Sequence, residues 1–364
     1  MQRIIHEYRN ASRIFNMIEG LYTYVSDTEF MFEDVLWLDK SFSKVCDILT
    51  SKLSIFRIPE LKSFALPQIT LPSRKKEVIV CLSGGKDSAA TALYYKKLGY
   101  TVHLYHMTGV NRAYGDEKSA AQNIAKYLDC DLHIDKLQYL GDNQFIEHPL
   151  KNYLIANGAI HYAIAKNYPP VIAFGNFNQS FLDVNEFEVC GGDCIEMWQA
   201  YEPIIQTVIP NFKMEIPLST NADSFDILKD DWTMFTMSIS CMSPYRFREH
   251  WRHRVENKYN VKILDNRCGC CWKCCVETMW LMDNNYMDYD EEYYLHCVGI
   301  LIYTIWKESG IEVESVKDAW YNYMFYPIEE SKAWKLLDGC TYKNLKTRAA
   351  IIVPASSGWI RGGE

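Results

Sequence analysis

The sequence predicts an α/β fold with a parallel sheet, preceded by a helical extension and followed by a helical region. Between residues 77 and 175, short β-branched apolar runs alternate with stretches of helical period, as in strands joined by crossover helices. A Gly-rich loop follows the first of these runs, and a cysteine cluster lies beyond the last. The chain has 364 residues, of which 48% are hydrophobic, enough to bury a core across two to three domains.

The elements can be placed in order along the chain. Apolar residues recur at spacings of three and four up to about residue 53, which predicts a helical N-terminal extension that ends near residue 75. Strands are then expected at Glu77–Leu82, Val102–Met107, Asp131–Leu137 and Val171–Gly175, and helices between them at Ser88–Leu98, Glu117–Leu128 and Leu154–Asn167. The predicted division is an extension over 1–75, a core domain over 76–283 and a helical C-terminal region over 284–364.

Charge and composition exclude several classes of protein. With 38 basic and 46 acidic residues the net charge is −8, which argues against a non-specific nucleic-acid coat and a polybasic membrane anchor. Charged residues within positions 1–10 leave no room for a signal peptide, and the longest apolar run, Cys297–Trp306, is too short to span a membrane. An odd count of 13 cysteines without a secretory signal does not indicate a disulfide framework. We expect a cytoplasmic protein with no membrane partner.

The loop Ser83-Gly-Gly-Lys-Asp-Ser88 has the composition of a phosphate site. Its glycines let the backbone approach phosphate oxygens, its serines add donors, Lys86 adds a charge, and Asp87 suits Mg²⁺ or the helix start. The spacing matches neither a Walker A loop nor G-x-G-x-x-G. A tight turn with a capping serine is the ordinary explanation of a lone Gly-Gly pair, but six such residues between a strand and a helix favour phosphate.

The cysteine cluster indicates a metal site. Five cysteines lie within the eight residues from Cys268 to Cys275. Cys268, Cys271 and Cys274 have the Cys-x-x-Cys spacing that presents thiolates to one zinc ion, and Cys241 is the best fourth ligand. Cys270 and Cys275 are left over as thiols. A three-cysteine iron–sulfur cluster stays open as the rival, since spacing alone does not fix the metal.

Ser83 to Ser88 resembles the S-G-G-x-D-S loop of the N-type ATP pyrophosphatases, the PP-loop superfamily, whose sheet is Rossmann-like and of the HUP type. Members adenylate a carboxylate or carbonyl oxygen for attack by ammonia or sulfur, so the resemblance implies ATP and Mg²⁺. It implies catalytic roles for Lys86, Asp87 and Ser88. It also implies nucleotide contacts by Leu82, Ser83, Gly84, Gly85, Lys86, Asp87, Ser88, Ala89, His106, Met107 and Gly175.

With the cysteine motifs added, residues 77–283 resemble the 7-cyano-7-deazaguanine synthases. That family makes a nitrile from 7-carboxy-7-deazaguanine, ammonia and ATP on the way to queuosine. Three family features are missing here: the aspartate of G-x-N-x-x-D after the fourth strand, with Asp183 nearby; the arginine after Cys194; and a lysine after Leu218, with Lys229 as the nearest substitute. Because these losses fall on the substrate side, the chain is similar to diverged synthase-like proteins encoded in antiviral defence operons.

The expected activity is therefore ATP-dependent C–N ligation on a deazapurine-type small molecule or on a protein or nucleic-acid acceptor. A tRNA sulfur transferase and a non-catalytic ATP-binding partner are the rivals. A homodimer and an operon-encoded protein partner both stay open as assemblies.

Three further features have ordinary alternatives. Five basic residues and Trp251 within Tyr245–Lys258 suit RNA, but a solvated helix face is the more common explanation. The acidic residues around Cys190 and Cys194 indicate a surface loop, with one carboxylate available to substrate or Mg²⁺. Four histidines in apolar surroundings are expected to be satisfied core residues, and of these His106 is expected to face the nucleotide: His103, His106, His161 and His296.

Overall fold

The computed structural model describes residues 22–24, 30–32, 69–108, 116–136, 151–175, 195–206, 209–219, 221–243, 245–309, 331–333 and 335. They fall into two compact units. The loop unit comprises the described residues of 1–112 and 117–238, and the cysteine unit comprises Asp116 and the described residues of 239–364. The predicted domain boundaries after residues 75 and 283 stay predictions, because a compact unit need not coincide with a domain.

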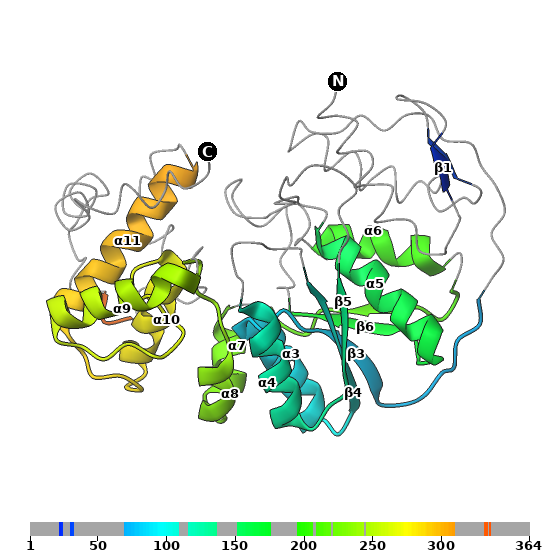
Figure 1. Cartoon of the computed structure of the whole chain (residues 1–364), viewed down its shortest axis with the longest axis horizontal. Coiled ribbons are helices and arrows are strands. Elements are labelled where there is room, and N and C mark those ends of the chain that lie inside the picture. Colours follow the sequence, from blue (N-terminus) through cyan, green and yellow to red (C-terminus); the bar gives the residue numbers. More distant parts are fainter. Residues whose placement is uncertain are drawn as a thin grey trace. The chain divides into compact units, whose positions relative to one another are not determined.

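The loop unit is built on a five-stranded parallel sheet in the order β5-β4-β3-β6-β7 (Figure 1). Its strands are β3 (Glu77–Cys81), β4 (Thr101–Thr108), β5 (Leu132–Lys136), β6 (Val171–Phe174) and β7 (Lys213–Glu215). The chain moves outward from β3 to β4 and β5, then returns to the other side of β3 to form β6 and β7. The strand order thus reverses between β3 and β6, the place where α/β sheets of this kind bind ligands.

Helices cover both faces of this sheet, with α3 (Lys86–Lys97) and α4 (Glu117–Leu128) on one face and α5 (Lys151–Lys166) and α6 (Ile195–Gln206) on the other (Figure 1). All five residues of β3 are buried, as expected for a central parallel strand. On the α6 side, Trp198 packs against Phe174 with ring centroids 4.9 Å apart. The short helices α7 (Asn221–Leu228) and α8 (Trp232–Met237) complete the unit.

The predicted α/β fold with its parallel sheet is confirmed, and each of the four predicted strands and three predicted helices is present with small shifts at its ends. One strand of the parallel sheet was not predicted: β7, Lys213–Glu215, has only three residues and two of them are charged. Such a short polar edge strand has no alternating apolar pattern that the sequence could reveal.

The predicted helical extension is wrong where the structure describes it. Tyr22–Tyr24 and Phe30–Phe32 form the antiparallel strands β1 and β2, with Thr23 opposite Met31. Aromatic residues, which both segments contain, and β-branched residues such as Thr23 favour strands. The rest of residues 1–68 lies outside the described part of the chain.

The cysteine unit is helical, as predicted. Its helices are α9 (Tyr245–Tyr259), α10 (Trp272–Asp283) and α11 (Glu291–Ser309), and their apolar faces share a core that includes Val255, Met279, Tyr294 and Leu301. The apolar stretch that begins at Cys297 belongs to α11, in agreement with its interpretation as a core helix. No helix in the described part of the chain is both long and apolar enough to cross a membrane.

Candidate functional site

The Gly-rich loop lies between β3 and the start of α3, beside the end of β6. Gly84 has a φ of +90°, and a Cβ atom there would lie 2.8 Å from the backbone oxygen of Glu117 at the start of α4. A Cβ on Gly175 would lie 2.5 Å from the Ser88 nitrogen. Both positions therefore require glycine, because backbone packs on backbone at each of them. Gly175 thus lies against the loop, as expected from the strand order.

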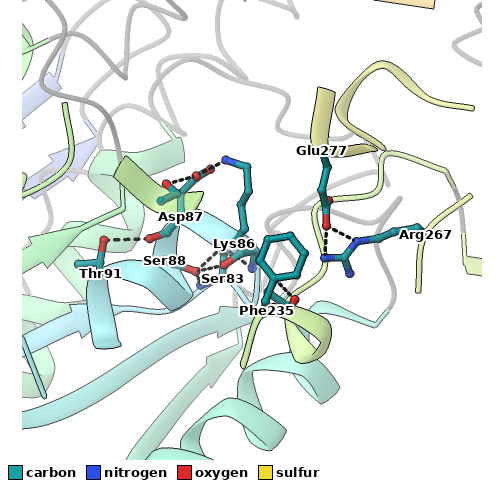
Figure 2. Close-up of polar contacts among 11 residues, drawn as sticks. Ser83, Lys86, Asp87, Ser88, Thr91, Phe235, Arg267 and Glu277 are labelled. Carbon is teal, nitrogen blue, oxygen red and sulfur yellow. Dashed lines mark hydrogen bonds and ion pairs between the residues drawn. The ribbon is translucent and has the colours of Figure 1, made fainter. Parts of the chain in front are cut away.

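The two serines of the loop hold its backbone in shape. Their hydroxyl oxygens are 3.0 Å apart, and the Ser83 amide donates to Ser88 Oγ at 3.2 Å. Gly85 N–H donates to Ser83 Oγ, and Ser88 Oγ–H donates to the Gly85 carbonyl (Figure 2). Gly85 is the N-cap of α3 with extended backbone, and first-turn amides of a helix have no carbonyl partner within it. This geometry is suited to an anion at the start of α3.

The two charged residues of the loop meet each other. Lys86 Nζ forms an ion pair with the Asp87 carboxylate (Figure 2). The lysine side chain is 8% exposed and the aspartate side chain 32%. The pair therefore keeps its lysine inside the protein and its carboxylate within reach of solvent, which suits an aspartate that binds a solvated Mg²⁺.

Two residues of α7 contribute to the site and were not found from the sequence. Ser224 is fully buried and donates from Oγ to Asp87 Oδ1 at 2.6 Å, and the Phe225 ring centroid lies 5.0 Å from Lys86 Nζ. Ser224 and Asp87 are 137 positions apart in sequence, and no motif connects them. Their only signal is that α7 follows the fifth strand, whose carboxyl end lies on the same side of the sheet as the loop.

His106 supports the strand end that precedes the loop. Its Nδ1 donates to the Leu82 carbonyl at 2.7 Å, and the side chain is buried. Burial lowers the pKa of His106, so the ring is neutral and its Nε2 is the acceptor nitrogen. Met107, the next residue of β4, is half-buried. That these two residues contact adenine stays a prediction.

Several predicted substrate-side residues lie outside the described part of the chain, among them Asn176, Asp183, Cys190, Asp193 and Cys194. The substitute candidate Lys229 follows α7 and binds Asp226 at 2.8 Å. Asp223 accepts the Ser219 amide at 2.6 Å, so its carboxylate caps the start of α7.

The cysteine unit brings together the four predicted metal ligands. The sulfur atoms of Cys241, Cys268, Cys271 and Cys274 all lie within 4.8 Å of one another, and those of Cys268 and Cys274 are 3.9 Å apart. A tetrahedron with zinc–sulfur bonds of about 2.3 Å places its sulfurs about 3.8 Å apart. The thiolates of a cubic iron–sulfur cluster bond to separate irons and lie further apart. The four residues therefore fit a single zinc ion.

The two remaining cysteines of the cluster, Cys270 and Cys275, are not among the four grouped sulfurs, as predicted. Cys275 is buried in the helical core, and Cys270 is half-buried and packs against both groups of apolar residues. Burial raises the pKa of Cys275, which keeps it a thiol. Neither belongs to the set of four sulfurs that face one another.

Backbone amides and two arginines surround the four sulfurs. Met242 N–H donates to Cys271 Sγ at 3.4 Å, and Cys271 N–H donates to Cys268 Sγ at 3.2 Å. Arg248 pairs with Asp116 and donates to the Ser243 carbonyl at 3.1 Å, while Arg267 holds the buried Glu277 carboxylate through bonds of 2.6 and 2.8 Å (Figure 2). Four thiolates around a divalent ion would carry two excess negative charges, which the amide donors and the nearby guanidinium groups would help to stabilise.

The histidine expectation holds for His103, whose Nε2 lies 2.9 Å from the buried Glu77 carboxylate. It is wrong for His296, which is buried in the α11 core without a hydrogen-bond partner for either ring nitrogen among the described residues. Aromatic rings surround it instead, with the Tyr259 centroid at 5.2 Å and the Tyr293 centroid at 6.2 Å.

Comparison with known proteins gives one family match and several matches to curated proteins. The family model of the queuosine biosynthesis protein QueC matches residues 77–171. A 7-cyano-7-deazaguanine synthase 2 from Sulfurisphaera tokodaii is 33% identical over 97 residues, which cover 26% of this chain and 21% of that protein. A 7-cyano-7-deazaguanine synthase from Sulfolobus acidocaldarius is 28% identical over 103 residues, 28% of this chain and 20% of that protein.

A relative with a different activity matches as well. A tRNA-5-methyluridine(54) 2-sulfurtransferase from Pyrococcus horikoshii is 31% identical over 77 residues, 21% of this chain and 25% of that protein. The chain thus spans a quarter or less of the length of each of these relatives. Residues 77–171 are thus similar to the QueC family of the PP-loop ATP pyrophosphatase superfamily, with distant homology to 7-cyano-7-deazaguanine synthases and tRNA thiolases.

Proposed function

We propose that the protein is an ATP-dependent adenylating enzyme of the 7-cyano-7-deazaguanine synthase type, which activates a carboxylate for attack by ammonia. The observation that supports this most strongly is the position of the loop 83–88. It lies where the strand order reverses, and Gly84 and Gly175 let its backbone pack closely against α4 and the end of β6.

Each loop residue has a role in this proposal. The amides at the start of α3 and the serine hydroxyls bind the β- and γ-phosphates that leave as pyrophosphate. Lys86 turns from Asp87 to the phosphates and stabilises the charge that develops on them, while Asp87 binds Mg²⁺. Ser224 keeps the Asp87 carboxylate in place through its bond to Oδ1. Most of the catalysis is then positioning and charge stabilisation, since ATP brings its own leaving group.

The chemistry balances in two steps for an amide product. A carboxylate oxygen of the substrate attacks the α-phosphorus, the bond to the β-phosphate oxygen breaks, and an acyl-adenylate and pyrophosphate result. Ammonia then attacks the acyl carbon, AMP leaves with the bridging oxygen, and one proton is released. A second adenylation, on the amide oxygen, followed by loss of AMP and protons would give a nitrile.

The test uses the purified full-length protein with MgATP, 7-carboxy-7-deazaguanine and ammonium. We expect AMP and pyrophosphate in equal amounts, with an amide or nitrile mass among the products. Asp87→Asn should abolish AMP formation, whereas Asp226→Asn, a carboxylate of α7 that binds Lys229, should leave it unchanged. Release of ADP and phosphate, or no turnover with this substrate and a panel of other carboxylates, would contradict the proposal.

A tRNA sulfur transferase is the second candidate, because the Pyrococcus horikoshii sulfurtransferase is 31% identical to this chain over 77 residues. Such an enzyme requires a reactive cysteine near the loop. In the described part of the loop unit, Cys81 is buried in β3 and Cys130 is half-buried, and burial raises the pKa of both thiols. Incorporation of labelled sulfide into tRNA, with ATP and without ammonium, would favour this candidate over the ligase.

A further inference from the structure

Helix α9 in the cysteine unit carries a surface that neither the ATP loop nor the metal site uses. Phe247, Trp251, Arg254 and Lys258 follow one another at spacings of four, three and four residues, which places them on one stripe of the helix. We name this stripe the α9 face. Phe247 is 43% exposed, Arg254 and Lys258 are exposed, and Trp251 is half-buried against the cysteines.

The two cations of the α9 face have aromatic neighbours instead of acidic ones. The Arg254 guanidinium lies 5.0 Å from the Trp251 ring centroid, and Lys258 Nζ lies 4.6 Å from that of Tyr259. Within the described residues neither cation pairs with a carboxylate. Lys258 lies in the last turn of α9, where a cation is favoured, but a like charge four residues earlier disfavours the helix. Helix stability therefore gives no reason for Arg254 at that position.

The other charges of α9 are used elsewhere. Glu249 and Glu256 lie on the opposite side of the helix from Phe247, where both contact His253. Arg252 is paired with Asp265 at 2.7 Å, and Arg248 with Asp116. The α9 face thus keeps uncompensated positive charge in a protein whose net charge is −8.

Exposed residues next to the four-cysteine cluster lie near the start of α9. Met242, whose amide donates to Cys271 Sγ, is 38% exposed, and Tyr245 at the start of α9 is 65% exposed. Exposed aromatic and apolar side chains thus accumulate at one end of the α9 face, which is about 16 Å long from Phe247 to Lys258 and has its two cations at the other end. Exposed rings offer stacking platforms to bases, and cations bind a phosphate backbone.

We propose that the α9 face binds single-stranded nucleic acid, with bases stacked on Phe247 and phosphates held by Arg254 and Lys258. An acidic polypeptide would satisfy the cations but would gain little from an exposed phenylalanine on the same face. A duplex would hide its bases from the ring. Binding of nucleic acid at the α9 face would require neither ATP nor the proposed ligase activity.

The test is fluorescence anisotropy with the zinc-loaded full-length protein, without ATP, using labelled 12-nucleotide single-stranded RNA, the same sequence as DNA, and an RNA duplex. We expect single strands to bind more tightly than the duplex, with affinity that falls as salt rises. The RNA and DNA arms show which sugar is preferred. The double change Arg254→Gln, Lys258→Gln should weaken binding about tenfold or more and reduce the salt slope by about 1.4.

Phe247→Leu should weaken binding about fivefold or more with an unchanged salt slope, because it removes stacking and keeps charge. Arg252→Gln is the matched control. Arg252 lies on the same helix but outside the α9 face, where it pairs with Asp265, so its loss should change affinity less than about twofold. Near-ultraviolet circular dichroism and zinc content verify that each variant is folded. Absence of single-strand binding, equal binding of the duplex with no effect of Phe247→Leu, or binding of polyglutamate alone would overturn the proposal.

Discussion

The loop unit and the cysteine unit hold their sites in different ways. In the loop unit, a buried parallel sheet fixes the strand ends, and glycines let one backbone segment rest on another, so the loop has its shape without a ligand. In the cysteine unit, four cysteine sulfurs face one another among buried arginines, an arrangement that fits a metal ion. The loop site is therefore built by packing, whereas we expect the cysteine site to be held together by the metal that it would bind.

Removal of the metal should give the largest difference in stability between the two units. Structural zinc contributes on the order of 10 kcal/mol or more to folding of small sites. Chelation or Cys268→Ser should therefore abolish hydrogen-exchange protection in α9 and α10 while β3 and β4 stay protected. Cys270→Ser, a neighbour outside the four-sulfur set, serves as the control and should keep about one zinc per chain. If α10 kept its hydrogen-exchange protection in metal-free protein, the cysteine unit would not depend on a metal for its fold.

Acid should weaken the cysteine unit through His296. Burial lowers the pKa of His296 from 6.5 to about 4, so the folded protein keeps the ring neutral where the unfolded chain binds a proton. Stability is thus lost as pH falls from about 6.5 toward about 4, by up to about 3 kcal/mol. In His296→Phe, the free energy of unfolding measured with urea should depend less on pH than in the unmodified chain. Metal release at low pH would affect both proteins, so the difference between them isolates the histidine. Parallel pH profiles would show that this histidine does not titrate on unfolding.

Close backbone approach at the ATP loop can be tested with two glycines of similar conformation. Gly84 and Gly99 have φ values of +90° and +76°, but a Cβ on Gly99 would meet only Lys76 Nζ at 3.9 Å. Both Gly→Ala changes strain the backbone, by about 1–2 kcal/mol. Gly84→Ala should cost about 1–3 kcal/mol more in urea unfolding and lower ATP affinity in calorimetry at least about tenfold. Equal effects of the two changes would mean that packing against α4 does not shape the loop.

Ser224 should give the smallest effect. Ser224→Ala removes the bond to Asp87 Oδ1 and should weaken MgATP binding a few-fold, since a hydrogen bond to a charged group contributes about 1.5–3 kcal/mol, part of which water replaces. Thr91→Val is the matched control, because it removes a bond to the Asp87 backbone oxygen and leaves the carboxylate untouched. If Thr91→Val weakens MgATP binding as much as Ser224→Ala, the serine acts on stability alone.

The sequence was sufficient for the features that local chemistry decides. β-branched runs, the Gly-Gly pair and the Cys-x-x-Cys spacing each predict their element or site from neighbouring residues. The contacts of Ser224 with Asp87 and of Arg248 with Asp116 join positions more than a hundred residues apart, so no local pattern could reveal them. The strands at Tyr22–Tyr24 and Phe30–Phe32 show that a helical spacing of apolar residues can be overruled by β propensity.

Oxygen transfer is the most direct test of the central claim, that the loop activates a carboxylate at the α-phosphorus of ATP. The protein is incubated with MgATP, ammonium and 7-carboxy-7-deazaguanine labelled with ¹⁸O in both carboxylate oxygens, and the nucleotides and phosphates are analysed by mass spectrometry. If the labelled carboxylate attacks the α-phosphorus, we expect AMP that carries one ¹⁸O and pyrophosphate that carries none. Unlabelled AMP, or label in inorganic phosphate, would contradict it.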